Sequence, residues 1–124
     1  MKQILAIAAG GALGSVLRFW MSGWVSGVFG RGFPYGTLTV NVLGSLLVGF
    51  LYVLLVDKFH ASAEWRAVLL IGLLGGFTTF SSFSMETFNL LEAGEITKAL
   101  MNIILSVTVC LAATWIGVLV GRQM

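Results

Sequence analysis

The hydrophobic pattern of the chain divides it into long apolar segments separated by short polar connections. The apolar segments are Ile4 to Phe29, Tyr35 to Val56, Ala67 to Leu91 and Ala99 to Val120. Each of them exceeds the roughly 20 residues that a helix needs to cross about 30 Å of hydrocarbon. The connections between them are too short to form an extramembrane domain. The pattern therefore predicts an all-α membrane protein, with residues 1–124 forming a single domain of four transmembrane helices.

The composition supports this prediction. Hydrophobic residues make up 58% of the chain and charged residues 10%, and the mean hydropathy of +1.00 lies far outside the range of soluble domains. The formal net charge of +2 is spread without a basic run, so no nucleic-acid partner is predicted. The single cysteine, Cys110, excludes an internal disulfide and is expected to be a small packing residue. We expect the function to take place within the bilayer.

The distribution of Lys and Arg gives only a weak orientation signal. Four spans place both termini and the second connection on one side of the membrane. That side carries Lys2, Lys58, Arg66 and Arg122, whereas the other side carries Arg31 and Lys98. If Arg18 reaches the second side, the count becomes four against three. Because the excess of Lys and Arg in cytoplasmic loops sets orientation, such a near tie permits insertion in both directions.

Glycines recur four residues apart in three of the four segments. The pairs are Gly10 and Gly14, Gly23 and Gly27, Gly72 and Gly76, and Gly117 and Gly121. This spacing puts both members on one helix face and lets two helix backbones approach closely. We expect packing within the subunit to account for at least half of the pairs. Four short helices can hardly enclose a pathway alone, so an oligomer is also predicted.

The third segment contains a stretch that lipid would not tolerate. Residues 75–86 include two adjacent glycines, two threonines, three serines and a carboxylate. Irregular or hydroxyl-rich backbone at membrane depth persists only where protein covers it or where it lines a watery cavity. We therefore predict that the third helix is broken near Gly75 to Thr79. The two glycines would let the chain leave helical geometry, and a second half-helix would begin near Ser81 or Ser82.

A break of this kind is a candidate ion site. Unwound carbonyls in a membrane helix bind monovalent cations, and the N-terminus of a half-helix favours anions. Phe77, Phe80 and Phe83 recur every third residue and are expected on roughly one face. Phenylalanines at helical spacing are usually core residues. Beside hydroxyls in a pathway, however, their electropositive ring edges can face an anion.

Two polar stripes accompany the break. The second segment carries Thr37, Asn41 and Ser45, and the fourth carries Asn102, Ser106, Cys110 and Thr114, each four residues from the last. A single hydroxyl often bonds to its own helix, and a lone Asn often only joins two helices. Three converging polar sets favour a lined pathway instead.

Arg18 is the one cation inside a predicted span. An arginine there must face a polar cavity, pair with another group or extend to the interface. We favour extension to the interface or a structural pairing over direct contact with a ligand.

Three motifs together identify a family. They are Gly10-Gly11-x-x-Gly14-x-x-x-Arg18, Gly36-Thr37-Leu38-x-Val40-Asn41-x-x-Gly44 and Gly75-Gly76-Phe77-Thr78-Thr79-Phe80-Ser81-Ser82-Phe83-Ser84-x-Glu86. The chain resembles the Fluc (CrcB) fluoride channel family over essentially its whole length. The resemblance implies a passive fluoride channel, not an enzyme, in the inner (plasma) membrane. It also implies an antiparallel, dual-topology homodimer with two fluoride pathways and a sodium ion at the dimer centre.

The resemblance also implies roles for individual residues. Gly75 and Thr78 would offer main-chain oxygens to the sodium ion, and Arg18 would lie at the vestibule. The fluoride pathway would comprise Asn41, Phe80 and Phe83, with Thr37, Ser81, Glu86, Ser106 and Thr114 as further polar members. Two positions depart from the family pattern. Phe19 stands where a tyrosine is common, and Cys110 where a hydroxyl is expected.

Two other functions compete with the channel. A small multidrug or quaternary-cation antiporter also has four short helices, but it needs a carboxylate in its first helix. The first helix here offers Arg18 and no acid, and Glu86, the only carboxylate within a span, lies elsewhere. A passive structural subunit would give no reason for the hydroxyl-rich break. Neither alternative accounts for the motif of the third segment.

Overall fold

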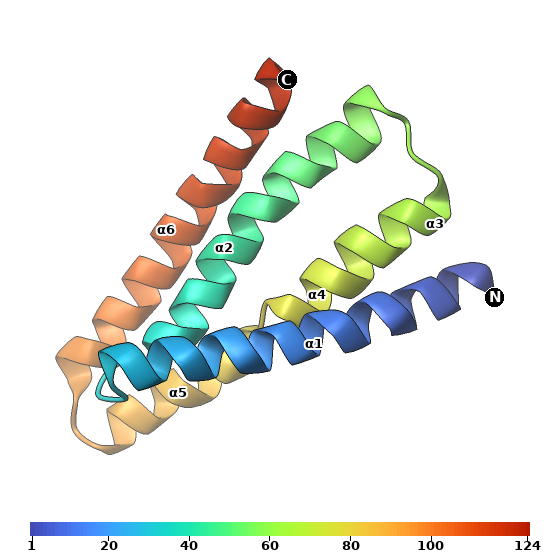
Figure 1. The fold of residues 1–124 in the computed structure, drawn as a ribbon. Coiled ribbons are helices and arrows are strands. Elements are labelled where there is room, and N and C mark those ends of the chain that lie inside the picture. The colour runs from blue at the N-terminus through green and yellow to red at the C-terminus, as the bar shows by residue number, and fades with distance from the viewer.

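The computed structural model describes residues 1–124, and all regular structure in it is helical (Figure 1). The helices are α1 (Lys2–Phe29), α2 (Tyr35–Tyr52), α3 (Ala63–Arg66), α4 (Leu74–Phe77), α5 (Phe80–Glu92) and α6 (Ile96–Gln123). A π-helical segment η1 (Val53–Lys58) extends α2, and a second one, η2 (Ala67–Leu73), joins α3 to α4. The four predicted spans are confirmed, since four helical stretches are long and apolar enough to cross a membrane.

Local sequence signals set the ends of the spans. Gly30 and Gly94 follow α1 and α5 with φ of 92° and 79°, a left-handed backbone that glycine adopts without steric cost. Pro34 precedes α2, and the Ser62 side chain accepts the Trp65 N–H at the start of α3. The connections after α1 and after α5 lie together at one end of the molecule (Figure 1). The C-terminus and the connection between η1 and α3 lie at the opposite end.

The spans pack as two pairs in which helix backbones touch. One pair joins α1 to η2 and α4, and the other joins α2 to α6 (Figure 1). A Cβ atom on Gly14 would overlap the Leu73 carbonyl oxygen, and a Cβ atom on Gly117 would overlap that of Leu46. Gly23 and Gly27, by contrast, have nothing near the Cβ position. The predicted packing role is thus confirmed for the glycine pairs other than Gly23 and Gly27.

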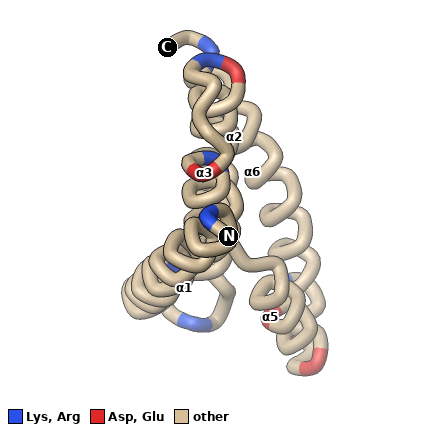
Figure 2. Tube along the Cα trace, turned by 90° about the vertical axis from the view of Figure 1, so that its right-hand side faces the viewer, with Lys and Arg blue, Asp and Glu red and all other residues tan.

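Few side chains are buried within a single chain. Only 21 of 124 residues are buried, and many large apolar side chains, the tryptophans Trp20, Trp24 and Trp115 among them, are exposed. Most charged residues lie near the helix ends (Figure 2), and Arg18 and Glu86 are the exceptions inside the spans. Lipid is as apolar as these side chains, so the hydrophobic effect does little to join membrane helices. Close backbone packing and hydrogen bonds must therefore hold the spans together.

The break in the third span lies within the predicted range but is narrower. Helix α4 ends at Phe77, Thr78 and Thr79 are extended with ψ of 156° and 113°, and α5 begins at Phe80. The expectation that Gly75 and Gly76 let the chain leave helical geometry was wrong, because both remain helical.

Packing against α1 gives Gly76 its role. A Cβ atom on Gly76 would lie 2.8 Å from the carbonyl oxygen of Gly11, so this glycine lets α4 approach α1. The second half-helix begins at Phe80, next to the predicted start near Ser81 or Ser82, and the side chain of Thr79 caps it.

We predict that Gly14→Ala destabilises the protein, because the added methyl group would overlap the backbone of η2. Overpacking of this kind typically costs about 1–3 kcal/mol. Gly23→Ala is the matched control in the same helix, since nothing lies within 4 Å of its Cβ position. Thermal unfolding of the purified proteins in detergent gives the comparison. Equal melting temperatures for the two variants would show that the close approach of α1 to η2 is not required.

Candidate functional site

A groove lies where the broken third span faces α2 and α6, and residues of all three spans line it. Residues predicted to bind ions contribute much of its lining: Asn41, Gly75, Thr78, Phe80, Phe83 and Ser106. Ser45, Thr79 and Cys110 line it as well, so both polar stripes reach the break. Thr37, Ser81, Glu86, Thr114 and Arg18 are not among the lining residues. The structure thus brings together the predicted sodium ligands, the predicted pore phenylalanines and the predicted pore asparagine.

The side chain of Asn41 holds the unwound backbone. Its Oδ1 accepts the N–H of Thr79 at 2.7 Å, and its Nδ2 donates to the Thr79 carbonyl at 3.1 Å. The amide therefore replaces a neighbouring peptide group and pairs both polar atoms of one residue. Gly44, one turn further along α2, lets Thr78 approach, because a Cβ atom there would overlap the Thr78 methyl group.

Thr79 also starts the second half-helix. Its Oγ1 accepts the N–H of Ser82 at 3.2 Å and donates to the Ser82 hydroxyl at 3.0 Å. The Ser81 hydroxyl lies 3.3 Å from the same oxygen. An N-cap of this kind satisfies one of the free N–H groups at a helix start.

The carbonyl groups at the end of α4 have different partners. The Leu74 oxygen accepts from the Thr78 N–H and hydroxyl, at 3.1 and 3.0 Å. In a continuous helix the N–H groups of Thr79 and Ser82 would donate to the carbonyls of Gly75 and Thr78. Here those two donors go to Asn41 and to the Thr79 hydroxyl instead. The carbonyls of Gly75 and Thr78, the predicted sodium ligands, have therefore lost their helical donors.

Arg18 makes the structural pairing that was one of its predicted roles. Its Nε donates to the Gly76 carbonyl at 3.0 Å, and the side chain is half-buried. A charged donor strengthens such a bond, and the pairing satisfies a carbonyl that the end of α4 leaves free. The implied place of Arg18 at a vestibule stays a prediction.

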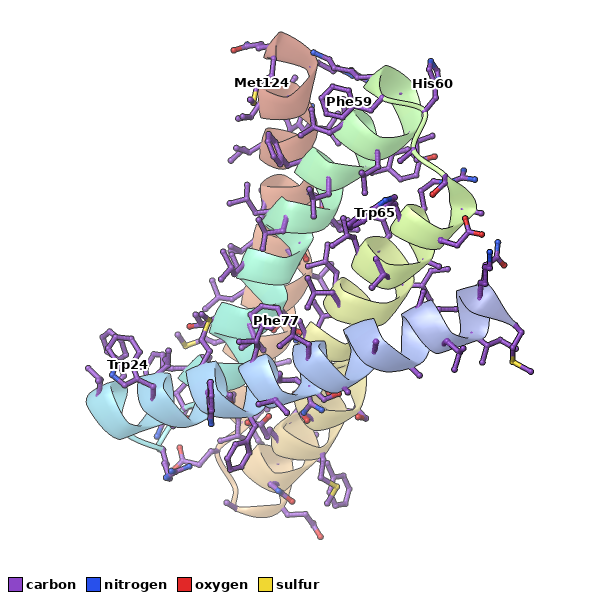
Figure 3. All side chains as sticks on the ribbon, turned by 45° about the vertical axis from the view of Figure 1, so that its right-hand side comes forward. Trp24, Phe59, His60, Trp65, Phe77 and Met124 are labelled. Carbon is purple, nitrogen blue, oxygen red and sulfur yellow. The ribbon has the colours of Figure 1, made fainter.

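The three phenylalanines of the motif do not share one face. Phe77 is 6% exposed and lies between α1 and α2 (Figure 3). Phe80 is 76% exposed, Phe83 is half-buried, and their ring centroids lie 5.2 Å apart on the groove. The prediction of a common face was wrong, because two extended residues separate Phe77 from Phe80. Phe77 is a packing residue, and the other two border the groove.

Most hydroxyls of the polar stripes already donate within the protein. Thr37 donates to the Glu86 carboxylate, and Thr114 donates to the Ser45 carbonyl at 3.0 Å. These bonds join α2 to α5 and α2 to α6. Ser106 donates to Asn102 at 3.4 Å. The stripes therefore join helices, and they line the groove only in part.

One connection was missed from the sequence. Asn102 donates to the Thr87 hydroxyl at 2.8 Å, and Thr87 donates to the Phe83 carbonyl at 2.7 Å. Thr87 lies one helical turn after Phe83, which is an ordinary spacing within a helix. The sequence therefore gives no sign of the bond to Asn102, which depends on how α6 packs on α5.

Comparison with known proteins relates the chain to a single family. A family model described as "CrcB-like protein, Camphor Resistance (CrcB)" matches residues 5–118. The chain is 51% identical, over all 124 residues of both proteins, to a protein of Geobacter metallireducens named fluoride-specific ion channel FluC. A protein of the same name from Hydrogenovibrio crunogenus is 51% identical over 98% of this chain and 92% of its own. One from Methylococcus capsulatus is 50% identical over 98% of this chain, which spans only 54% of that longer relative.

We predict that Asn41→Leu exposes the Thr79 peptide group to exchange with solvent. Leucine fills a similar volume but pairs with neither polar atom of Thr79, and each buried polar group left unpaired costs roughly 1–3 kcal/mol. Asn89→Leu in α5 is the matched control, because Asn89 is exposed. Hydrogen exchange read by mass spectrometry across residues 74–84 measures the effect. Unchanged protection in Asn41→Leu would contradict the role assigned to this amide.

Proposed function

The chain belongs to the CrcB-like family, and on that basis we propose that it is a fluoride-selective channel through which fluoride leaves the cell passively. The observation that carries the proposal is the groove at the break, which is lined by two phenylalanines of the third span, by the residues whose carbonyls have lost their helical donors, and by Asn41 of the second span. Relatives about half identical to this chain are named fluoride-specific ion channels. The protein is a multi-pass protein of the inner membrane.

The groove suits a small, strongly hydrated anion. A channel must replace the water around its ion without binding the ion too tightly for release. The ring edges of Phe80 and Phe83 offer a weak positive potential instead of a full charge. The Asn41 amide has two N–H groups, and only one donates to Thr79. Its second N–H can replace a water molecule of the ion.

The hydroxyl groups can bind fluoride only after they give up hydrogen bonds within the protein. The protons of Thr37, Ser106 and Thr114 are donated within the protein. To bind fluoride, each hydroxyl must turn its proton toward the ion and leave its present acceptor. Glu86 would then lose the hydrogen bond that Thr37 donates to it, so the environment of that carboxylate would change as an ion passes. We therefore place the strongest interaction with fluoride at Asn41, Phe80 and Phe83.

We propose that the functional unit is an antiparallel homodimer. A single chain leaves Phe80 largely exposed beside a groove that contains amide, hydroxyl and carbonyl groups. Polar groups at this depth must be covered by protein or water, because lipid cannot pair with them. A second copy would cover the groove, and the near tie of Lys and Arg permits that copy to insert inverted.

A sodium ion at the dimer centre fits the donor set of this chain. The carbonyls of Gly75 and Thr78 have lost their helical donors, and both residues line the groove. Two inverted copies would supply four neutral oxygens, a set that suits a hard monovalent cation. A divalent ion there would leave charge uncompensated in a low-dielectric surrounding. When bound, the cation would join the two breaks.

The antiporter alternative receives no support from the geometry. Its mechanism needs a carboxylate in the first helix that exchanges protons against a cation. In α1 the charged side chain within the span is Arg18, which is paired with Gly76. Glu86 lies in α5 and accepts a hydrogen bond from Thr37.

We predict that Phe80→Ile and Phe83→Ile each lower fluoride flux roughly tenfold or more while the dimer still assembles. Isoleucine fills comparable space but lacks the positive ring edge. Fluoride efflux from proteoliposomes, read with a fluoride electrode, measures the loss. Phe88→Ile is the matched control, because Phe88 is an exposed residue of the same helix that does not line the groove. Equal losses at all three positions would return the phenylalanines to a packing role.

We also predict that sodium raises the melting temperature of the purified protein and supports fluoride efflux, whereas potassium at equal ionic strength does neither. The reason is that the carbonyls of Gly75 and Thr78 lack a partner without the ion. Thermal unfolding and efflux are compared in sodium and in potassium buffers after exhaustive exchange. Indistinguishable curves in the two buffers would rule out a sodium site at the break.

A further inference from the structure

We propose that Asn102 is a positioning residue for the fluoride pathway: acting through Thr87, it fixes α5 so that Phe83 is held at the groove. This inference rests on the function proposed above. Asn102 itself does not line the groove and is 2% exposed, so it is not placed to touch the ion. Its effect would be transmitted entirely through hydrogen bonds.

Helix α5 needs such a constraint because little apolar packing holds it. Thr87 is the one buried residue of the helix. Its large apolar side chains Met85, Phe88 and Leu91 are exposed. A helix held by apolar contacts alone could rotate or tilt against α6 at small cost in such a setting. Directional polar contacts are what can define its orientation.

Polar contacts join α5 and the residue before it to the other helices at three points. Asn41 pairs with Thr79 just before the helix, and Thr37 donates to Glu86 in its middle. Both of these contacts use residues assigned to the fluoride pathway, so an ion can compete for them. The bond between Asn102 and Thr87 is buried and uses no pathway residue. It can therefore persist while the other two change.

The bond is part of a directed series that links two groove residues. Ser106 donates to Asn102 Oδ1 at 3.4 Å, Asn102 Nδ2 donates to Thr87 Oγ1 at 2.8 Å, and Thr87 donates to the Phe83 carbonyl at 2.7 Å. Each proton points toward Phe83, and both ends of the series, Ser106 and Phe83, line the groove. Removing Asn102 would leave the Ser106 hydroxyl without its acceptor and the Thr87 oxygen without its donor in a buried setting, which is costly. Asn102 therefore determines where Phe83 and the Ser106 proton lie.

The test compares five variants in fluoride efflux and in thermal unfolding. Asn102→Leu and Thr87→Val each break the series while keeping the branching of the side chain, and the double variant replaces both partners by apolar groups. Thr87→Ser keeps the hydroxyl and should rescue function. Thr108→Val is the matched control on α6, because the exposed Thr108 hydroxyl donates only to its own helix at Ile104.

We expect Asn102→Leu and Thr87→Val each to lower fluoride flux roughly tenfold, and we expect Thr87→Ser and Thr108→Val to stay close to the unmodified protein. The double variant should regain part of the melting temperature that either single variant loses, because replacing both partners by apolar groups is nearly neutral, although the Ser106 hydroxyl still lacks its acceptor. Its flux should remain low, since apolar contact does not fix the orientation of α5.

Two results would overturn the proposal. One is full flux in Asn102→Leu, and the other is a double variant that recovers flux together with melting temperature, which would make the pair an ordinary packing contact. The unmodified protein separates this inference from the proposed function. If that protein releases no fluoride, the channel proposal itself fails.

Discussion

The structure depends on how a piece of unwound backbone is paired inside a membrane. Thr78 and Thr79 are extended, so the Thr79 N–H and the carbonyls of Gly75 and Thr78 lose their helical hydrogen bonds, and lipid offers no replacement. The replacements come from other spans: the Asn41 amide pairs both polar atoms of Thr79, and Arg18 pairs the Gly76 carbonyl. The carbonyls of Gly75 and Thr78 have lost their helical donors, and both residues line the groove. The way in which the break is stabilised thus also determines which atoms are left for an ion.

Close helix packing makes these pairings possible. Gly14 and Gly76 let α1 and the end of α4 approach until their backbones touch, which brings Arg18 within reach of a carbonyl. Gly44 does the same for α2 and Thr78. The contacts are side chain to backbone or backbone to backbone, as expected where the hydrophobic effect contributes little. The glycines and the polar residues therefore act as one arrangement, although they lie on different spans.

The sequence was sufficient for the spans and for the break, and insufficient for details that depend on a partner helix. Four apolar segments of adequate length predict four spans, and hydroxyls inside the third predict an interruption. Which residues unwind could not be read locally, because the role of Gly76 is to let α4 approach α1. Phe77 and Phe80 point in different directions because Thr78 and Thr79 between them are extended. A prediction based on helical periodicity assumes a continuous helix and misses this change. The bond between Asn102 and Thr87 requires the packing of α6 on α5.

The central claim is that one chain forms only part of the pathway, and that an inverted second copy completes the groove. The most direct measurement is fluoride efflux from proteoliposomes made with variants locked in one orientation by extra lysines at one end or the other. The account predicts that neither locked form conducts by itself and that the two forms together restore efflux. Normal efflux from a single locked form would contradict it.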